Sequence, residues 1–277
     1  MKTEQSLAFI GCGVMAESMI AGLLHEEIVR PEQIAGSHPR DNRRGELEEK
    51  YGIRMFEANA EAAETVRDVP GSAVVLSVKP QRVNRVLSDL KGVVSHNGLV
   101  ISIVAGAAIG TLSKELGSGH VVRAMPNTPA QIGAGITAWT CAEAVTDDER
   151  KLVRKLLLAL GKELYVETEN MIDMATSLSA TGPTYIFMVM EALTDAGVHL
   201  GFSRDVAKEL VQETMLGSVK FAMESHKHPA ELRNMVTSPG GTSAEAIYQM
   251  EKGTLRTVLS KAVYAAYKRA VELGKRD

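Results

Sequence analysis

The chain has 277 residues, which is enough for two domains that each bury a core. Its 45% apolar and 23% charged residues are ordinary for a globular protein, and a formal net charge of -3 argues against a general nucleic-acid binder. Its two cysteines are far apart and its longest apolar run, Leu99–Leu112, is too short to span a bilayer, so we expect a cytoplasmic protein that binds no membrane.

The first half of the chain alternates short apolar runs with helical stretches. The runs are typical of strands buried on both faces of a parallel sheet. The predicted strands are Leu7–Ile10, Ile34–Ser37, Ile53–Phe56, Ala73–Val78, Leu99–Val104, His120–Met125, Ile136–Thr140 and Glu163–Val166. The predicted helices between them include Val14–Glu26, Gln81–Leu90, Ile109–Leu116 and one opened by a capping box, Thr146 with Glu149. This alternation predicts an α/β fold, a Rossmann-like doubly wound parallel sheet, over residues 1–168.

The first predicted strand leads directly into a glycine-rich turn, FIGCGVMA. Gly11, Gly13 and the small Ala16 fit the G-x-G-x-x-G/A fingerprint, in which the first glycine makes the turn and the second admits a pyrophosphate. The helix start at Val14 and Met15 supplies free N–H groups for the phosphates. The sequence therefore predicts a dinucleotide at this turn.

The end of the second predicted strand indicates which dinucleotide binds. NAD-specific proteins usually place a carboxylate there for the ribose 2′-hydroxyl. In this chain the strand ends at Ser37, and Arg40, Arg43 and Arg44 follow. Guanidinium groups suit a 2′-phosphate, so NADPH is expected, with NADH weaker and with Ser37, Arg40 and Arg43 as ligands. The alternative is a solvated basic helix start, which would oppose the helix dipole.

Two other strands are followed by candidate cofactor-binding residues, because ligands bind at the carboxyl ends of parallel strands. Val78, Lys79 and Pro80 follow the fourth strand. Lys79 there is either a neighbour of the nicotinamide or a solvated loop residue. Asn127 follows the sixth strand and is expected to order its loop or to hydrogen-bond the cofactor, rather than to act as a catalyst.

Over residues 169–277 the strand patterns stop and helical spacing takes over. Pro183 suits the first position of a helix that runs to about Leu200. The charged residues of that helix are Glu191 and Asp195. A helix this apolar must be buried on every side, so this domain is predicted to pack against a second copy of the chain. Burial among the domain's own helices is the alternative.

The segment VTSPGGTSAEAI combines a turn with a helix start. Thr242 and Glu245 have the capping-box spacing, so Thr242 is predicted to be the N-cap with its hydroxyl engaged. Gly240 and Gly241 let a ligand approach the backbone, and Ser243 would point a free hydroxyl at an anion bound there. A capped surface helix without a ligand is the alternative.

Taken together, these motifs resemble the pyrroline-5-carboxylate reductase family along nearly the whole chain. The matching segments are GCGVMA, SVKPQ, VVRAMPNTPA, SLSATGPTYIF and VTSPGGTSAEAI. The family commonly has Ser-Gly-Ser-Gly-Pro-Ala-Tyr where this chain has Ser-Ala-Thr-Gly-Pro-Thr-Tyr at 179–185, and it commonly has two threonines where this chain has Thr242 and Ser243. Hydroxyl groups remain at Thr181 and Ser243, so activity is expected.

The resemblance implies NAD(P)H-dependent reduction of a cyclic imine, Δ1-pyrroline-5-carboxylate, to L-proline. It implies a helical dimerisation domain and homodimers that assemble further. It places the substrate carboxylate on the backbone amides of Gly241, Thr242 and Ser243, and the Ser243 hydroxyl beside the imine nitrogen. Thr242 and Ser243 are thus the candidate catalytic residues, and Gly240, Gly241 and Thr181 complete the candidate substrate site.

Two rival interpretations are weaker. A β-hydroxyacid dehydrogenase has a similar layout but carries a catalytic lysine on the first long helix of its second domain, and this chain has no lysine from Glu163 through Ala207. A non-catalytic NADP sensor would not need the glycine pair or Ser243. For a metal site, His226 and His228 lack a cysteine or acidic cluster at ligand spacing, so no metal is expected.

Overall fold

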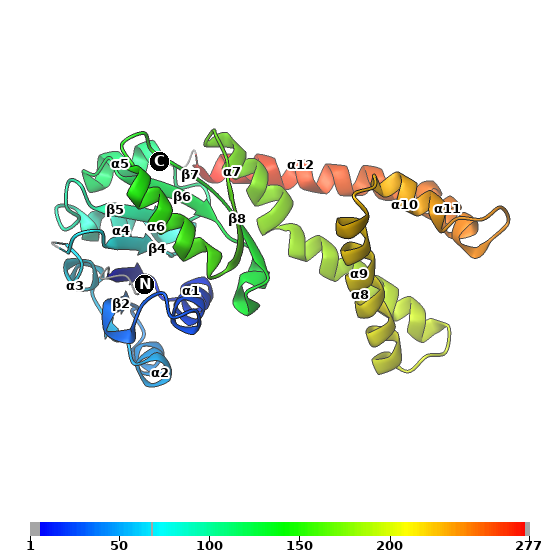
Figure 1. Ribbon diagram of the computed structural model, residues 1–277, viewed down its shortest axis with the longest axis horizontal. Coiled ribbons are helices and arrows are strands. Elements are labelled where there is room, and N and C mark those ends of the chain that lie inside the picture. Colours follow the sequence, from blue (N-terminus) through cyan, green and yellow to red (C-terminus); the bar gives the residue numbers. More distant parts are fainter. Residues whose placement is uncertain (1–5, 68, 275–277) are drawn as a thin grey trace. The chain divides into compact units, whose positions relative to one another are not determined.

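The computed structural model describes residues 6–67 and 69–274 (Figure 1). Contacts divide the chain into two compact units. The first comprises Met1–Thr181 with Ala266–Asp277, and the second comprises Gly182–Ala265. Residues 169–181 thus belong by contact to the first unit, while the functional boundary expected after residue 168 stays a prediction.

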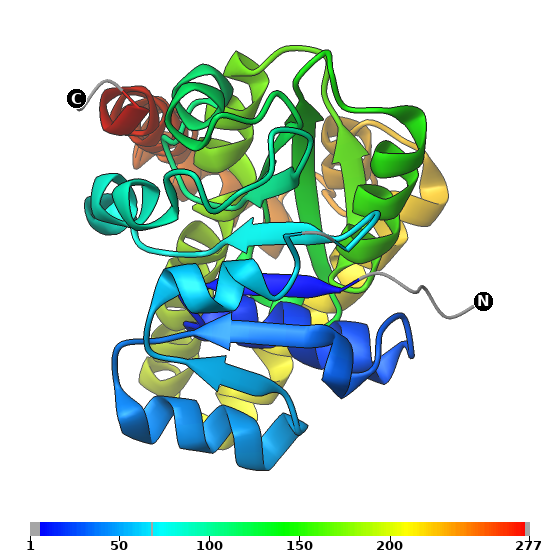
Figure 2. The same cartoon turned by 90° about the vertical axis from the view of Figure 1, so that its left-hand side faces the viewer.

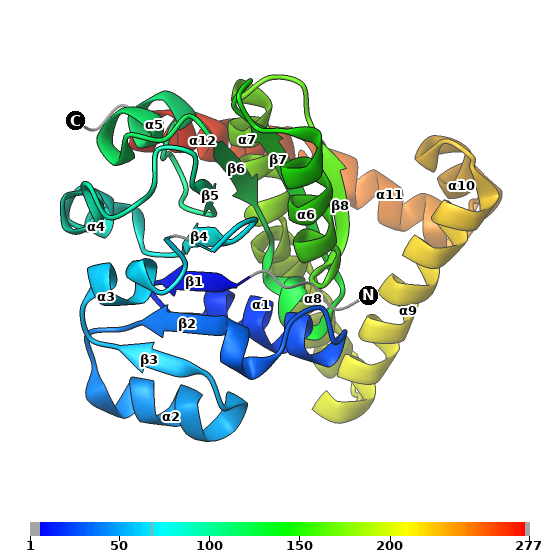
Figure 3. The same ribbon diagram turned by 60° about the vertical axis from the view of Figure 1, so that its left-hand side comes forward.

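The first unit is built on an eight-stranded sheet with the order β3-β2-β1-β4-β5-β6-β7-β8 (Figure 3). The strands are β1 Leu7–Ile10, β2 Ile34–Ser37, β3 Arg54–Phe56, β4 Ala73–Leu76, β5 Leu99–Ser102, β6 Val121–Met125, β7 Gly135–Cys141 and β8 Gly161–Tyr165. Strands β1 to β6 pair in parallel, whereas β7 runs antiparallel to β6 and parallel to β8. The strand order reverses at β1 and β4, which is where such sheets bind ligands. The predicted doubly wound sheet is confirmed.

Helices cover both faces of this sheet (Figure 2). They are α1 Val14–His25, α2 Asp41–Tyr51, α3 Asn59–Glu64, α4 Val83–Leu90, α5 Ile109–Leu116 and α6 Asp147–Leu158. In β1, Leu7 and Phe9 face the core shared with α1, α2 and α6, while Ala8 and Ile10 face the core shared with α3, α4 and α5. Because successive strand residues point to opposite faces, a continuously apolar strand supplies both cores at once.

Another helical segment, α7 Asn170–Ala175, leads through a wide π-helical turn, Thr176–Ala180, into α8 Gly182–His199. The predicted helix from Pro183 to about Leu200 is confirmed to within one residue, because Pro183 is the second residue of α8. The N–H of Thr181 bonds to the carbonyl of Thr176, five residues back, at 2.9 Å.

The second unit contains α8, α9 Arg204–Ser225, α10 Pro229–Met235, α11 Thr242–Lys252 and the first part of α12 Leu255–Gly274. Helices α8 and α9 pack on each other, yet no residue of α8 is buried. Phe187 and Met188 are 57% and 65% exposed. Burial of α8 among the helices of its own unit is therefore not observed. No helix in the described part of the chain is long and apolar enough to cross a membrane.

Candidate functional site

The glycine-rich turn after β1 has the geometry of a phosphate-binding loop. Gly11 has a φ of +89°, and a Cβ on it would lie 2.3 Å from Val78 Cγ1, so only glycine fits. Gly13 is the N-cap of α1, has no side-chain cap, and has nothing within 4 Å of its Cβ position. The N–H groups of the first turn, at Val14 and Met15, therefore face open space that suits a pyrophosphate.

Cys12 lies between these glycines and is fully buried. Burial raises the pKa of its thiol to about 12, so the group stays protonated and unreactive. The loop is tied to β2, because the N–H groups of Gly11 and Cys12 both donate to the carbonyl of Ser37, at 3.2 and 2.9 Å.

A cavity of about 870 Å³ adjoins this turn at the carboxyl ends of β1 to β4. It is lined by Gly11, Pro39, Glu57, Ala58, Asn59, Ala60, Glu61, Val78, Arg82, Arg85, Val86 and Asp89. Its size and its place at the switch point suit the adenosine half of a dinucleotide.

Asn59 is a cavity residue that the sequence reasoning missed. It accepts a hydrogen bond from the Ser37 hydroxyl at 2.8 Å and donates to Asp89 at 2.9 Å. Ser37 itself is fully buried behind Asn59, and its contact with a cofactor stays a prediction. Its position in the sequence could have indicated this role. Asn59 begins α3 soon after β3, and β3 ends at the same edge of the sheet as β2.

The three arginines at the start of α2 are not equivalent. Arg43 forms ion pairs with Glu17 and, at 3.2 Å, with Glu46, and its Nε donates to the carbonyl of Cys12 at 3.4 Å. Arg44 donates to the carbonyl of His38 at 2.9 Å and pairs with Asp41 at 2.8 Å.

The side chain of Arg40 is exposed and has no hydrogen bond or ion pair within the described part of the chain. Of the three, Arg40 is thus the cation available to an incoming phosphate. Nearby, burial and the charges of these arginines lower the pKa of His38. A neutral His38 adds no positive charge to this corner.

Lys79 and Asn127 lie at the carboxyl edge as predicted. Lys79 is exposed and is the N-cap of a short 3-10 turn, Pro80–Arg82, so the predicted helix from 81 begins as this turn. Asn127 accepts from the N–H of Ile136 at 3.0 Å and donates to the Ser179 hydroxyl at 3.5 Å. Asn127 therefore orders its own loop, and its contact with a cofactor stays a prediction.

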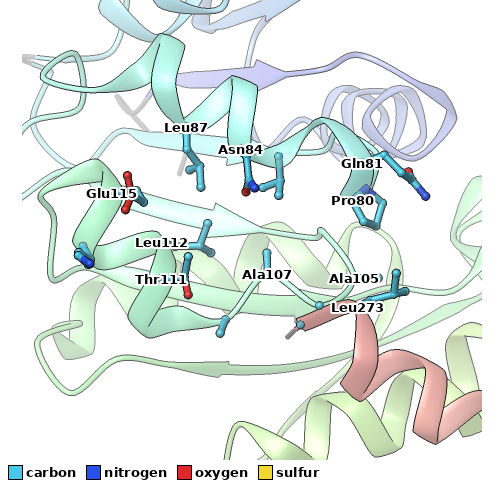
Figure 4. Close-up of a pocket in the computed structure, with 15 residues that line it drawn as sticks. Pro80, Gln81, Asn84, Leu87, Ala105, Ala107, Thr111, Leu112, Glu115 and Leu273 are labelled. Carbon is cyan, nitrogen blue, oxygen red and sulfur yellow. The ribbon is translucent and has the colours of Figure 1, made fainter. Parts of the chain in front are cut away.

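Pro80 faces a second cavity, of about 580 Å³, between α4, α5 and the end of α12 (Figure 4). Asn84 and Leu87 come from α4, Thr111 and Leu112 from α5. This cavity continues the same edge of the sheet past β4. The described residues contain no group of three His, Cys, Asp or Glu that could hold a metal ion.

In the second unit, the turn before α11 differs from the prediction at one residue. The N-cap is Gly241 with no side-chain cap, so the prediction that Thr242 caps the helix with its hydroxyl is wrong. The reason is that Gly240 takes a φ of +69° and the N–H of Gly241 bonds to the carbonyl of Ser238 at 3.1 Å, so the turn closes on the glycines. Thr242 is the first helical residue.

This arrangement leaves the start of α11 open to an anion. The N–H groups of Thr242 and Ser243 have no intrahelical partner, as at any helix start, and the N-cap of this helix makes no side-chain hydrogen bond to them. Of the three amides expected to bind the carboxylate, that of Gly241 is already bonded to the carbonyl of Ser238, whereas those of Thr242 and Ser243 are not.

Thr181, the remaining candidate, lies at the end of the π-helical turn in the first unit. Its hydroxyl donates to the carbonyl of Thr176 at 2.9 Å. The hydroxyl proton is thus held by the backbone, and the oxygen remains able to accept a hydrogen bond from a ligand.

Comparison with known proteins covers both units. Residues 169–273 match the family model described as pyrroline-5-carboxylate reductase dimerisation, and residues 6–106 match that described as NADP oxidoreductase coenzyme F420-dependent. The chain is 39% identical to a pyrroline-5-carboxylate reductase of Synechocystis, over 98% of each chain. A solved pyrroline-5-carboxylate reductase from Coxiella burnetii is 36% identical with a TM-score of 0.86, covering 99% of this chain and 100% of its own. The structure from Plasmodium falciparum, with NADP bound, is 29% identical with a TM-score of 0.89 and the same coverage.

Proposed function

The chain belongs to the pyrroline-5-carboxylate reductase family, and we propose how its own residues divide the work of that family's reaction. It is an NADPH-dependent oxidoreductase that reduces Δ1-pyrroline-5-carboxylate to L-proline, the final step of proline biosynthesis. The full-length match at 39% identity carries this conclusion and removes the β-hydroxyacid dehydrogenase and sensor interpretations.

For the cofactor, Gly11, Gly13 and the amides of Val14 and Met15 would hold the pyrophosphate. NADPH, when bound, supplies a hydride from its nicotinamide. Arg40 would pair with the 2′-phosphate, because it is the arginine of α2 whose charge is unpaired in the described part of the chain. Arg43 instead supports the loop through the carbonyl of Cys12.

For the substrate, the open start of α11 would hold the carboxylate on the amides of Thr242 and Ser243. The Ser243 hydroxyl would accept a hydrogen bond from the protonated imine nitrogen, and Thr242 and Gly240 would shape the turn. A protonated imine is already electrophilic at carbon, so the protein needs little acid–base machinery. Its main contribution is alignment, which is worth several kcal/mol.

The assembly follows from the surface of the second unit. A homodimer through α8 and its neighbours would bury Phe187 and Met188, and the match to a dimerisation family model supports it. Higher homo-oligomers and a cytoplasmic location remain predictions. Size-exclusion chromatography with light scattering measures the first of these directly.

The decisive experiment follows NADPH oxidation with Δ1-pyrroline-5-carboxylate in the wild type and in Ser243→Ala. Loss of one hydrogen bond to a charged group lowers kcat/KM by about 10- to 100-fold. The Kd for NADPH should stay the same, because Ser243 is assigned to the substrate. Ser218→Ala is the matched control, since this exposed serine bonds only to its own helix at Thr214.

The two possible failures are distinct. A wild type that does not oxidise NADPH with this imine contradicts the reaction itself. An active wild type with an unchanged Ser243→Ala rate removes Ser243 from the mechanism and leaves the reaction in place.

A further inference from the structure

Arg123 is a charged side chain in the core of the first unit. It lies on β6 and is 3% exposed. Its guanidinium spans two carboxylates: Nη1 is 3.1 Å from Glu169 Oε1, and Nη2 is 2.6 Å from Asp173 Oδ1. The remaining Nε is buried and has no partner in the described part of the chain. Arg123 therefore joins one strand of the sheet to two successive turns of the helical segment that contains α7.

The same cluster reaches a third element. Glu169 Oε1 also accepts the N–H of Ile109 at 2.8 Å, which is the first residue of α5. The loop between β5 and α5, with Ala105 and Ala107, precedes Ile109 and lines the cavity in Figure 4. Arg123 thus fixes Glu169, and Glu169 fixes the end of that loop.

Below the cluster, α7 packs on the sheet through a small apolar core. Ile172 is fully buried against Met125 of β6, Ala138 of β7 and Val166, which follows β8. Figure 3 shows α7 beside β6 and β7. This core holds α7 against the sheet, but apolar contacts are not directional, so they leave its rotation and its sliding along β6 less constrained. The two ion pairs of the Arg123 guanidinium, with Glu169 and Asp173, are directional and constrain the rotation and sliding of α7.

The segment that α7 leads into contacts one of the candidate site residues at the carboxyl edge of the sheet and carries another. Two residues after Arg123 the strand ends, and Asn127 donates to Ser179 in the π-helical turn. That turn ends at Thr181, whose hydroxyl is held by Thr176. The position of Thr181 therefore depends on where α7 sits on β6.

The chemistry of the cluster argues for a role in positioning. A buried ion pair often contributes no more stability than apolar side chains of the same volume, and here one buried N–H is left without a partner. Buried charged groups of this kind can instead specify one arrangement of the elements that they join.

We propose that Arg123 is a positioning residue for the reduction: its bonds to Glu169 and Asp173 set α7 on β6, and thereby place Thr181, Asn127 and the β5–α5 loop at the carboxyl edge of the sheet in the first unit. This inference rests on the proposed function. It assigns no chemical step to Arg123 itself.

The test compares Arg123→Met, Arg123→Lys and Asp173→Asn with the wild type. In each we measure kcat, the KM for the imine, the Kd for NADPH, the melting temperature, and the isotope effect on kcat with NADPH deuterated at C4. Misalignment of the reacting atoms should lower kcat by about 10- to 100-fold in Arg123→Met and raise the isotope effect, because hydride transfer becomes the slow step. The Kd for NADPH should change by less than about twofold. Arg123→Lys keeps the charge but loses the fork, so it should restore the melting temperature more than kcat.

Glu149→Gln is the matched control. It breaks another partly buried ion pair of the same strand region, between Glu149 and His120, at 2.9 Å and just before β6. This variant should lower the melting temperature and leave kcat and the isotope effect unchanged.

Three outcomes overturn the proposal. Arg123→Met that folds and keeps kcat within about twofold overturns it. The proposal is also overturned if kcat falls in proportion to the melting temperature in every variant, the control included. If Arg123→Met does not fold, the other two variants decide. A kcat equal to that of the wild type in both Arg123→Lys and Asp173→Asn overturns the proposal. A lowered kcat with a raised isotope effect in these two variants supports the proposal. An inactive wild type, in contrast, overturns the assigned reaction and with it this inference.

Discussion

The two units of the chain treat their apolar side chains in opposite ways. In the first, Phe9 and Ile101 are fully buried, and helices cover both faces of the sheet. In the second, Phe187 and Met188 are more than half exposed. Among the described residues of this unit, only Ala207 is buried. The first unit completes its core with its own residues, whereas the second leaves apolar side chains uncovered, which is the surface assigned above to the proposed homodimer.

The difference has a geometric origin. A sheet strand offers two faces, and α/β connections place a helix on each, so the chain covers its own apolar surface. A pair of long helices such as α8 and α9 buries one stripe on each helix and leaves the rest uncovered. An apolar helix such as α8 therefore keeps exposed apolar side chains that the proposed homodimer would cover.

The largest expected effect comes from placing a charge on that uncovered surface. Met188→Glu should raise the dissociation constant of the homodimer by about 30- to 1,000-fold, because a central interface side chain contributes about 2–4 kcal/mol. Light scattering and sedimentation measure the change, and activity should fall as the dimer dissociates.

Leu158→Glu is the control for this prediction. Leu158 is 51% exposed on α6 in the first unit, so the same kind of change should leave the oligomer intact. A Met188→Glu protein that remains a dimer at low concentration would show that α8 is not covered by a second copy, and the contrast between the two units would fail.

A second prediction asks whether the first unit alone sets the cofactor preference. Arg40→Ala should raise the KM for NADPH by about tenfold and leave the KM for NADH nearly unchanged, since the lost contact is to the 2′-phosphate. Arg43→Ala should weaken both cofactors by similar factors, because Arg43 supports the glycine-rich loop through the carbonyl of Cys12.

Steady-state kinetics with both cofactors separate the two arginines. Equal effects of Arg40→Ala on NADPH and NADH would remove Arg40 from the 2′-phosphate site. A selective effect of Arg43→Ala on NADPH would assign Arg43 to the 2′-phosphate site, where the sequence pattern placed it together with Arg40.

The sequence predicted the fold of the first unit well, because each strand carries its own pattern. β1, β2 and the start of β4 lie where the apolar runs placed them. It could not predict the contacts that individual site residues make within the protein, because these partners are distant in sequence. Arg43 is paired with Glu17, which lies 26 positions away on another helix. Spacing alone could not reveal that the arginine was already occupied.

A third prediction concerns that pair and its dependence on pH. Burial raises the pKa of Glu17, but hydrogen bonds from Arg43, Lys50 and Tyr51 outweigh it and lower the pKa to about 2, from 4.5. A lowered folded-state pKa adds stability that is complete above about pH 4.5 and is lost as the pH falls toward about 2. Glu17→Gln should therefore cost about 1–2 kcal/mol near pH 7, and less below pH 4.

Urea unfolding at several pH values, followed by the fluorescence of the single tryptophan, Trp139, measures this difference. Trp139 is buried in β7, so it reports on the first unit. A cost of Glu17→Gln that stays constant from pH 7 to pH 3 would show that the lowered pKa contributes nothing to stability.

The smallest expected effect compares two helix starts with the same sequence spacing, one in each unit. At α6, Thr146 caps the helix: its hydroxyl accepts from the N–H of Glu149 at 3.3 Å, and Glu149 accepts from the N–H of Thr146 at 2.8 Å. At α11, Thr242 makes no cap. Thr146→Ala should thus cost about 1 kcal/mol in the free energy of unfolding, whereas Thr242→Ala should cost much less.

Thr242→Ala should act on the substrate instead. Its melting temperature should match the wild type, because the hydroxyl caps no helix, while the KM for the imine should rise, because Thr242 is assigned to the substrate site. A stability loss equal to that of Thr146→Ala would mean that Thr242 caps α11 in solution, and the open helix start that separates this turn from the one at α6 would no longer be available to a carboxylate.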